Sequence, residues 1–375
     1  MGIFQTTFQS CSGRERTGIL STAHGQVETP VFMPVGTQGT IKGLTPDQVK
    51  EIGFDIILAN TYHLFLQPGD DVVQAAGGLH TFMHWNRAIL TDSGGFQAMS
   101  LSRIRKKTDD GIDFQSFIDG SRHLFTPERV MDIQRNLGSD VVMPLDVCTG
   151  YPSDRATAAA DLDRTVKWFE RSKAAMGAPG GQHLFGITQG GFFGDLREEA
   201  AERILAHEPQ GFAVGGLSVG EERQLTMDML DHSLLHAPDN LPRYFMGLGD
   251  PVGILEVVSR GVDMFDCVLP TRVARNQMTF TRDGVVKMSK RLYERDFGPL
   301  QEDCACYCCQ HFSRAYVRHL FKANEMLAGT LATIHNLTFI RTLIVEIRQA
   351  IRSGTFAAYK RAFVDRYTAG SDRAW

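Results

Sequence analysis

AILTDSGG, residues 88–95, is a short apolar run that ends in an acid followed by three small residues. A run of this length that stops at a polar residue or glycine is typical of a buried strand in a parallel sheet. Seven further runs of this kind occur, mostly separated by stretches long enough for a helix. They are VFMPVG from Val31, DIILAN from Asp55, DVVMPLD from Asp140, LFGITQG from Leu184, GFAVGGL from Gly211, RYFMGLG from Arg243 and MFDCVLP from Met264. Eight such strands predict an α/β fold, a closed (β/α)8 TIM barrel.

The composition agrees with a large globular protein. The 375 residues are 43% hydrophobic and 22% charged, with a formal net charge of −4. These values support a large buried core and exclude a disordered or collagen-like chain. The N-terminus has no apolar stretch of signal-peptide length, and no run of 18 apolar residues follows. We therefore expect neither secretion nor a membrane partner.

Two segments are too long for simple loops of such a barrel. Residues 101–126 contain an alternating, turn-rich stretch and predict a hairpin-like insertion. Residues 272–331 contain a cysteine cluster and predict a metal-binding insertion after the eighth strand. Elsewhere the helical signals are regular, as at Thr45–Ile52 and Thr126–Leu137, each of which has Pro at its second position. We expect one barrel domain over residues 1–375 that includes both insertions.

Polar residues gather where the predicted strands end. In a barrel of this kind the active site lies at the C-terminal ends of the strands, so these side chains would surround one pocket. The polar side chains are those of Asp92, Asp146, Gln189 and Asp266, and the backbone at Gly216 and Leu217 would lie beside them. Each residue alone could serve only a turn or a helix cap. Their agreement favours a functional site, because delivering acids into a low-dielectric barrel mouth costs desolvation energy.

Two close carboxylates permit nucleophilic displacement at a sugar carbon, with one attacking and the other moving a proton. A third acid together with Gln189 can read the edge of a flat heterocycle, because carboxylate and amide offer acceptors and donors in one plane. Phe96 and Met246 lie near two strand ends and are candidates to sandwich its faces, although apolar residues there are more often plain core.

The cysteine cluster is the sharpest local signal. Cys304, Cys306 and Cys309, followed by His335, supply three thiolates and one imidazole, a closed set that suits one structural Zn²⁺ ion. Cys308 in the same loop leaves the choice of ligand open, and we favour Cys309. Crowded thiols in a large chain without a secretion signal also favour a reducing, cytoplasmic location.

The charge is unevenly distributed. Residues 272–322 contain ten Lys and Arg against five Asp and Glu, a net charge of +5 that leaves −9 on the rest of the chain. A basic insertion beside the active site of an acidic protein indicates a polyanionic partner, although this modest imbalance also fits a merely solvated face.

Taken together, these motifs resemble the tRNA-guanine transglycosylases over nearly the whole chain. The matching segments are ETPVFMPVGTQGTIKG, ILANTYHLFLQPG, LTDSGGFQ, DVVMPLDVCT, FGITQGG, FAVGGLSVGE, MGLG, GVDMFDCVLPTRVARN, and CACYCC with TIHNL. The resemblance implies that Asp266 is the nucleophile that attacks the ribose of the tRNA wobble guanosine, and that Asp92 is the general acid and base. Base recognition would fall to Asp146, Gln189, and backbone groups at Gly216 and Leu217, with Phe96 and Met246 stacking on the base.

The resemblance also implies which base is inserted. Cys148 and Val219 look like the bacterial pattern, in which a bulkier valine leaves less room for queuine. The expected reaction is therefore exchange of guanine for 7-aminomethyl-7-deazaguanine in queuosine biosynthesis, through a covalent enzyme–tRNA intermediate. Leu145 and Val147 depart from the Phe and Glu of many bacterial relatives. Members of this family are homodimers, so we expect a homodimer here.

Two other classes of protein compete with this interpretation. A metal-dependent barrel hydrolase would need histidine ligands at the strand ends, commonly a His-x-His pair, and the sequence contains no such pair. A non-catalytic RNA-binding subunit would lack the acids, whereas both Asp92 and Asp266 are retained.

Overall fold

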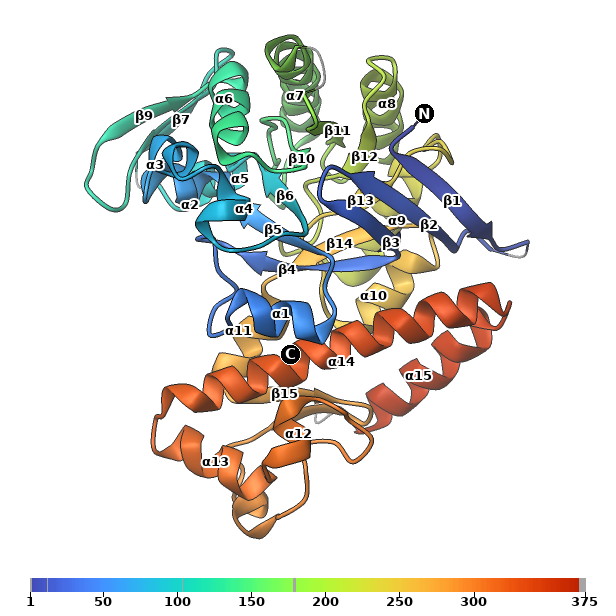
Figure 1. The fold of residues 1–375 in the computed structure, drawn as a ribbon. Coiled ribbons are helices and arrows are strands. Elements are labelled where there is room, and N and C mark those ends of the chain that lie inside the picture. The colour runs from blue at the N-terminus through green and yellow to red at the C-terminus, as the bar shows by residue number, and fades with distance from the viewer. Residues whose placement is uncertain (1, 12, 103, 178–179, 371–375) are drawn as a thin grey trace.

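The eight predicted strands form a closed parallel barrel. The computed structural model describes residues 2–370 apart from 12, 103, 178 and 179, and Figure 1 shows the barrel with its flanking helices. Around the barrel the strands follow one another in chain order, and the last pairs with the first. They are β4 (Val31–Gly36), β5 (Ile56–Asn60), β6 (Ala88–Asp92), β10 (Val141–Val142), β11 (His183–Thr188), β12 (Gly211–Val214), β13 (Arg243–Phe245) and β14 (Met264–Cys267). The prediction of a (β/α)8 barrel is thus confirmed.

The helices pack outside this barrel. They include α1 (Pro46–Ile52), α2 (Thr61–Leu66), α3 (Asp70–Ala75), α4 (Leu79–Phe82), α5 (Gly95–Ser100), α6 (Pro127–Leu137), α7 (Arg155–Met176), α8 (Gly194–Leu205), α9 (Arg223–Ser233), α10 (Pro251–Val258) and α11 (Leu269–Arg275). Thr45 and Thr126 cap α1 and α6 by accepting a backbone N–H, and a proline fills the first helical turn of each. Both helices therefore begin where the Thr-Pro pairs in the sequence predict.

Alternation along the strands fills the barrel interior. Every second side chain of a strand points inward, and one buried cluster collects such residues from all eight strands, including Met33, Leu58 and Leu90. The intervening residues, such as Ile57 and Ile89, belong to the larger cluster that the helices share. The strands are therefore apolar on both faces, which is why their sequences are continuous apolar runs.

An antiparallel sheet at the N-terminus closes one end of the barrel. It consists of β1 (Phe4–Gln9), β2 (Arg16–Thr22) and β3 (Gly25–Thr29). Phe4 and Leu20 join the interior cluster. Arg16 makes a doubly hydrogen-bonded ion pair with the buried Asp263, just before β14, at 2.6 and 3.0 Å. The sheet thus covers the end of the barrel where the strands begin.

The two long segments fold as additions to the barrel. Residues 101–126 contain a three-stranded antiparallel sheet, β7 (Arg105–Lys107), β8 (Ile112–Gln115) and β9 (Arg122–Phe125), one strand more than a hairpin. After α11 come the hairpin β15 (Met278–Thr281) and β16 (Gly284–Lys287), the 3-10 turn η1 (Arg291–Arg295), α12 (Tyr307–His311) and α13 (Arg314–Lys322). The long helix α14 (Met326–Arg352) and α15 (Phe356–Gly370) follow, so the last residues of the predicted 272–331 insertion already belong to α14.

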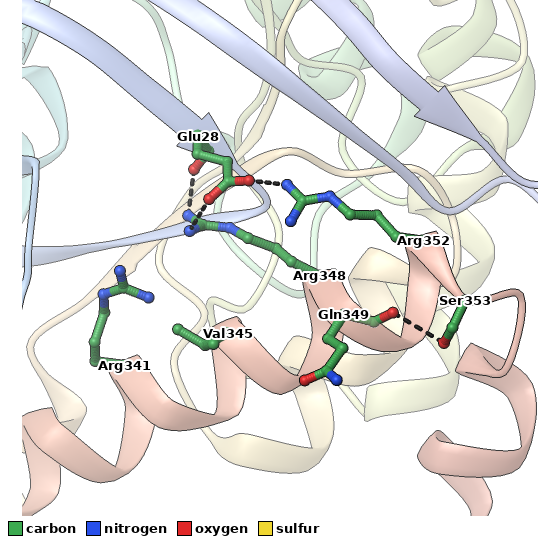
Figure 2. Close-up of a pocket in the computed structure, with 7 residues that line it drawn as sticks. All are labelled: Glu28, Arg341, Val345, Arg348, Gln349, Arg352 and Ser353. Atoms are coloured by element: carbon green, nitrogen blue, oxygen red, sulfur yellow. Dashed lines mark hydrogen bonds and ion pairs between the residues drawn. The ribbon is translucent and has the colours of Figure 1, made fainter.

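Helix α14 takes the place of the eighth barrel helix, since it packs on β4 between α1 and α10. Its end is fixed to the start of the barrel (Figure 2). Glu28 accepts a hydrogen bond from Arg348 at 2.9 Å and forms an ion pair with Arg352. Arg348 also donates to the carbonyl of Pro30 at 2.9 Å, directly before β4. These contacts border a groove of about 550 Å³ that Arg341 also lines.

None of the helices in the described part of the chain combines the length and the apolar character that a membrane-spanning helix needs.

Candidate functional site

The alternation that fills the barrel also aims polar side chains into its mouth. Asn60 and Asp92 continue the inward series of β5 and β6, and Asp266 continues that of β14. Gln189 follows β11 in the same register, and Tyr244 lies in β13. Five polar residues therefore meet above an apolar plug at the C-terminal ends of the strands.

Asp92 is held as a buried acid. One carboxylate oxygen accepts a hydrogen bond from Asn60 Nδ2, and the other accepts one from the backbone N–H of Thr61 at 3.0 Å. Burial raises the pKa of Asp92 to about 7, and the nearby carboxylates of Asp266 and Asp146 add to this rise. A carboxyl group with this pKa can both give and take a proton near neutral pH.

Asp266 faces the same space with different partners. Its Oδ1 accepts hydrogen bonds from the Tyr244 hydroxyl at 2.6 Å and from the backbone N–H of Gly247 at 3.1 Å. Burial raises the pKa of Asp266, and the two donors act against this rise. Both donors stabilise the charged form and leave Oδ2 without a hydrogen bond from the described residues, as an attacking oxygen requires.

Asp146 and Gln189 form a second polar pair. Gln189 Nε2 donates to Asp146 Oδ2 at 2.7 Å, while Ser93 approaches Oδ1 at 3.4 Å. Burial raises the pKa of Asp146 to about 6. Gln189 Oε1 is buried and finds no donor among the described residues. The pair thus offers one unmatched acceptor, which suits a ligand that brings an N–H group.

Gly216 is required beside this pair. Its φ of 70° lies in the left-handed region, and a Cβ atom there would come within 2.2 Å of Gln189 Oε1. Glycine therefore lets the backbone that follows β12 approach the amide, which keeps the Gly216–Leu217 peptide near the polar pair.

Two supporting residues were not predicted from the sequence. Arg197 of α8 is fully buried and donates to the carbonyls of Gly191 at 2.8 Å and Gly215 at 2.7 Å, which ties two strand ends together. Glu221 accepts hydrogen bonds from the N–H groups of Ser218 and Val219, the latter at 2.9 Å. Arg197 lies in an ordinary charged helical pattern that carries no signal, whereas Glu221 closes the GGLSVGE motif.

The remaining predicted residues follow the strand ends, on loops or, for Phe96, on helix α5. Leu217 is buried, Val219 and Met246 are half-buried, and Phe96 on α5 is 51% exposed. Burial raises the pKa of the Cys148 thiol to about 12, so this cysteine is a neutral group and no nucleophile. An exposed phenylalanine at the mouth suits a stacking role, and the roles of these five residues remain predictions.

The predicted metal ligands come together in the insertion. The Sγ atoms of Cys304, Cys306 and Cys309 lie 3.7, 3.6 and 3.2 Å from Nδ1 of His335, and all four ligand atoms lie within 4.8 Å of one another. These separations fit a tetrahedral ion, for which bonds of about 2.3 Å to sulfur place the ligands roughly 3.5–3.8 Å apart. Cys308 is buried in the core and is no member of the group, so the structure favours Cys309.

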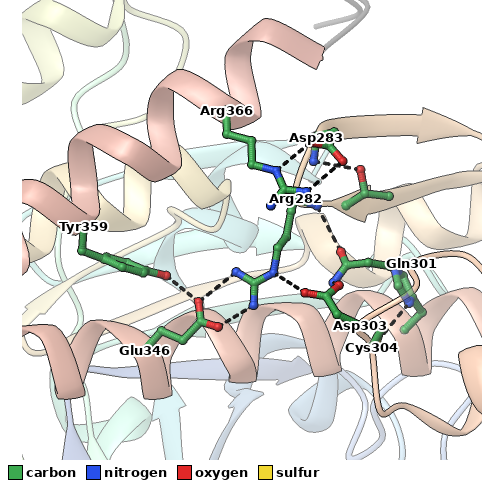
Figure 3. A network of polar contacts seen from close by, with 10 residues as sticks. Arg282, Asp283, Gln301, Asp303, Cys304, Glu346, Tyr359 and Arg366 are labelled. Carbon is green, nitrogen blue, oxygen red and sulfur yellow. Dashed lines mark hydrogen bonds and ion pairs between the residues drawn. The ribbon is translucent and has the colours of Figure 1, made fainter.

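Surrounding contacts orient this cluster. His335 Nε2 donates to the carbonyl of Phe280 at 2.7 Å, which turns Nδ1 toward the thiols. Figure 3 shows Arg282, next to β15, between Glu346 of α14 and Asp303, the neighbour of Cys304. The cysteine loop, the hairpin and α14 are thereby joined around a candidate metal site, whose four protein ligands would leave no open position and so suit a structural ion.

Another histidine–carboxylate group lies where the strands begin. His24 Nδ1 and His80 Nε2 lie 2.8 and 3.2 Å from the two oxygens of Asp140. The two rings stack with centroids 3.5 Å apart and planes 15° from parallel. An ion must lie near the plane of each imidazole that binds it, which two stacked rings do not allow. The group is therefore a hydrogen-bonded clasp between β3 and the barrel.

Comparison with known proteins agrees with this geometry. The sequence matches the family described as Queuine tRNA-ribosyltransferase over residues 11–369. It is 53% identical over 352 residues to the Queuine tRNA-ribosyltransferase of Thermoanaerobacter sp. (strain X514), covering 94% of each chain. It is 52% identical over 364 residues to that of Caldanaerobacter subterraneus subsp. tengcongensis, covering 97% of each chain. With Oleidesulfovibrio alaskensis the identity is 51% over 362 residues, or 96% of each chain.

Both the family match and these relatives extend over the barrel, the polar mouth and the Cys3His cluster together. The chain is therefore an enzyme that belongs to the queuine tRNA-ribosyltransferase family.

Proposed function

We propose that this chain exchanges the wobble guanine of a tRNA anticodon for 7-aminomethyl-7-deazaguanine, a step of queuosine biosynthesis. The observation that carries the proposal is the pair of the buried Asp92 and the half-buried Asp266, two carboxylates that face one barrel mouth with different hydrogen-bond partners. Family membership supports transglycosylation of tRNA. The identity of the base and the covalent intermediate are part of the proposal.

The reaction uses the two acids in turn. Asp266 Oδ2 attacks C1′ of the wobble ribose and forms a C–O bond as the C1′–N9 bond to guanine breaks. Asp92 gives its proton to the departing guanine. The incoming base then loses a proton to Asp92 and attacks C1′, and Asp266 leaves as the carboxylate. Asp92 ends protonated, as it began, which suits its pKa of about 7.

Asp146 and Gln189 read the edge of the base in this scheme. Gln189 Oε1 is a buried acceptor without a donor, and the Asp146 carboxylate accepts N–H groups beside it. The Gly216–Leu217 backbone adds further polar groups, and Phe96 and Met246 stack on the base. Cys148 and Val219 limit the space, which favours the aminomethyl base over the larger queuine.

The tRNA partner must present its base as a flipped-out nucleotide. Removing a base from its stack costs roughly a few kcal/mol. The net charge of +5 over residues 272–322 would attract the phosphate backbone of the tRNA. A second copy of the chain in a homodimer is expected from the family.

Zn²⁺ is the proposed ion of the cysteine cluster. Cys304, Cys306, Cys309 and His335 would hold it, and its role there is to fix the fold of the insertion. Reduced thiols of this kind are consistent with the cytoplasm as the compartment.

The test is incorporation of labelled guanine into a tRNA with a wobble guanine, followed by displacement with 7-aminomethyl-7-deazaguanine or with queuine. We expect incorporation, and displacement by the aminomethyl base alone. Asp266→Asn should abolish exchange and the covalent complex, whereas Asp163→Asn, on the exposed face of α7, should change neither. Equal displacement by queuine would contradict the assignment of the base, and absence of any exchange would overturn the proposed reaction.

A further inference from the structure

The small sheet β7–β9 is fixed to helix α7. The carbonyl of Asp109, in the turn after β7, accepts a hydrogen bond from Trp168 Nε1 at 2.8 Å. The carboxylate of the same residue pairs with Arg164 at 2.9 Å. Lys107, the last residue of β7, forms an ion pair with Asp161 of α7. The insertion thus presents a cation to α7.

Helix α7 in turn holds the loop that carries Asp146. Residues 143–150 have no regular secondary structure, so side chains must fix their position. Thr165 Oγ1 accepts a hydrogen bond from the N–H of Val147 at 3.1 Å. Asp161 Oδ2 accepts one from Thr149 Oγ1 at 3.1 Å. Two residues one turn apart on α7 therefore fix the loop on both sides of Cys148.

Asp161 connects these two sets of contacts. Its side chain is 4% exposed, and its two oxygens face in different directions, Oδ1 to Lys107 and Oδ2 to Thr149. A carboxylate this deeply buried requires cations, and Arg164 at 3.4 Å is the second one. Without Lys107, Oδ1 loses the partner that fixes the orientation of the carboxylate, so Asp161 can turn away from Thr149.

We infer that Lys107, Asp161 and Thr149 form a relay of positioning residues through which the β7–β9 insertion sets the placement of Asp146 and thereby the affinity for the inserted base. This inference rests on the proposed function of Asp146. None of the three residues reaches the reacting carboxylates Asp92 and Asp266 in the hydrogen bonds described above. The relay therefore acts on how well the base binds, and leaves the chemical step unchanged.

The first test measures steady-state exchange for Lys107→Met against Lys107→Arg. For Lys107→Met, we expect the KM for 7-aminomethyl-7-deazaguanine to rise about tenfold, as for a lost hydrogen bond to a charged group, with kcat and the KM for tRNA unchanged. Lys107→Arg keeps the charge and should restore most of the affinity. Lys167→Met, on the exposed face of α7, is the matched control and should resemble the unmodified enzyme.

The second test guards against a folding defect. Thr149→Val replaces the hydroxyl that donates a hydrogen bond to Asp161 by a methyl group of similar volume. Thr149→Ser keeps this hydroxyl. The Val variant should reproduce the rise in the KM for the base, and the Ser variant should not. An unchanged KM in both Lys107→Met and Thr149→Val, or a fall in kcat alone, would overturn the relay. Loss of all exchange in the unmodified enzyme would instead refute the proposed function, so the two failures are distinguishable.

Discussion

Tyr244 and Asp266 face each other from adjacent strands inside the barrel, and the phenolic hydroxyl donates to Asp266 Oδ1 at 2.6 Å. Burial alone would favour the neutral acid at this position, which cannot attack a sugar carbon. Tyr244 and the N–H of Gly247 oppose that tendency. The tyrosine thus favours the charged form of the carboxylate and leaves Oδ2 as the open oxygen.

Removing this hydroxyl should slow the exchange. Tyr244→Phe deletes a hydrogen bond that stabilises the charged carboxylate, so the pKa of Asp266 rises further. We expect kcat/KM to fall about tenfold near neutral pH and the acid limb of its pH profile to move to higher pH. A pH series of labelled-guanine exchange measures both effects, with Tyr316→Phe in the insertion as the control. An acid limb that moves to lower pH would contradict this role.

The pKa of Asp92 can be moved through its partner Asn60. Asn60 Nδ2 donates to the charged form of Asp92, and Asn60 also caps α2 with its side-chain oxygen. Asn60→Ser keeps an oxygen for the cap and loses the amide donor, so the pKa of Asp92 should rise above its value of about 7. The inflection in the pH profile of kcat should move upward with it. An inflection that stays in place would show that another group titrates.

The ionised carboxylate of Asp146 should lower the free energy of unfolding at neutral pH. Its folded-state pKa of about 6 exceeds the ordinary 3.8, so ionisation costs stability, which falls as the pH rises through this interval and stays low above it. Asp146→Asn removes this cost, because Gln189 can turn its amide toward the new side chain. We expect a gain of about 3 kcal/mol in unfolding free energy well above pH 6 and none below pH 3.8.

Thermal or urea unfolding of the Asp146→Asn variant at the two extremes of pH measures this difference. Asp163→Asn replaces an exposed aspartate on α7 that pairs with Arg203 at the surface, and it should change the unfolding free energy by less than about 1 kcal/mol. A variant that is less stable than the unmodified protein at alkaline pH would refute the prediction.

Variants of Cys309 and of Cys308 should differ in the amount of metal that they bind. Cys309→Ser removes one ligand of the cluster, and we expect loss of the bound ion together with unfolding of the insertion. Cys308→Ser changes a buried thiol outside the cluster and should keep one ion per chain with a small loss of stability. Elemental analysis and thermal unfolding of both variants provide the measurement. An ion retained by Cys309→Ser and lost by Cys308→Ser would reverse the assignment.

The anchor of α14 should contribute to stability through Arg348 more than through Arg352. Arg348 is buried and bonds both Glu28 and the carbonyl of Pro30, whereas Arg352 is half-exposed. We expect Arg348→Met to lower the unfolding free energy by about 2–4 kcal/mol, and Arg352→Met to lower it by less than about 1 kcal/mol. Urea unfolding compares them, and equal losses would contradict this ranking.

The sequence predicted the barrel well, for a physical reason. Strands that are buried on both faces must be continuous apolar runs, and they stop where backbone and polar groups meet solvent or ligand. The segments AILTD and MFDC are each an apolar run with an acid near its end, so the sequence alone predicts that these two acids lie at the mouth. The cysteine cluster is equally predictable, because the types of ligand and their spacing in the sequence indicate which residues can bind one metal ion.

Other features left no such trace. Tyr244 and Asn60 lie within predicted strands, yet only the closed barrel shows that their side chains meet Asp266 and Asp92. The sequence around Arg197 is typical of an exposed, charged helix, whereas its side chain is fully buried. The partner of Lys107 lies 54 residues away. Contacts of this kind depend on packing between distant segments, which local periodicity does not encode.

The pairing of β14 with β4 has a consequence for how the enzyme is made. The strand that carries Asp266 joins the first barrel strand, so the barrel stays open until at least residue 267 has emerged during synthesis. Helix α14, which then covers this seam, carries His335 of the metal cluster and Arg348 of the anchor on β3. Until residue 267 has emerged, a growing chain contains Asp92, Asp146 and Gln189 but lacks Asp266, the nucleophile that we propose. Under the proposed mechanism, a chain that ends before Asp266 therefore cannot break the bond between a base and its ribose.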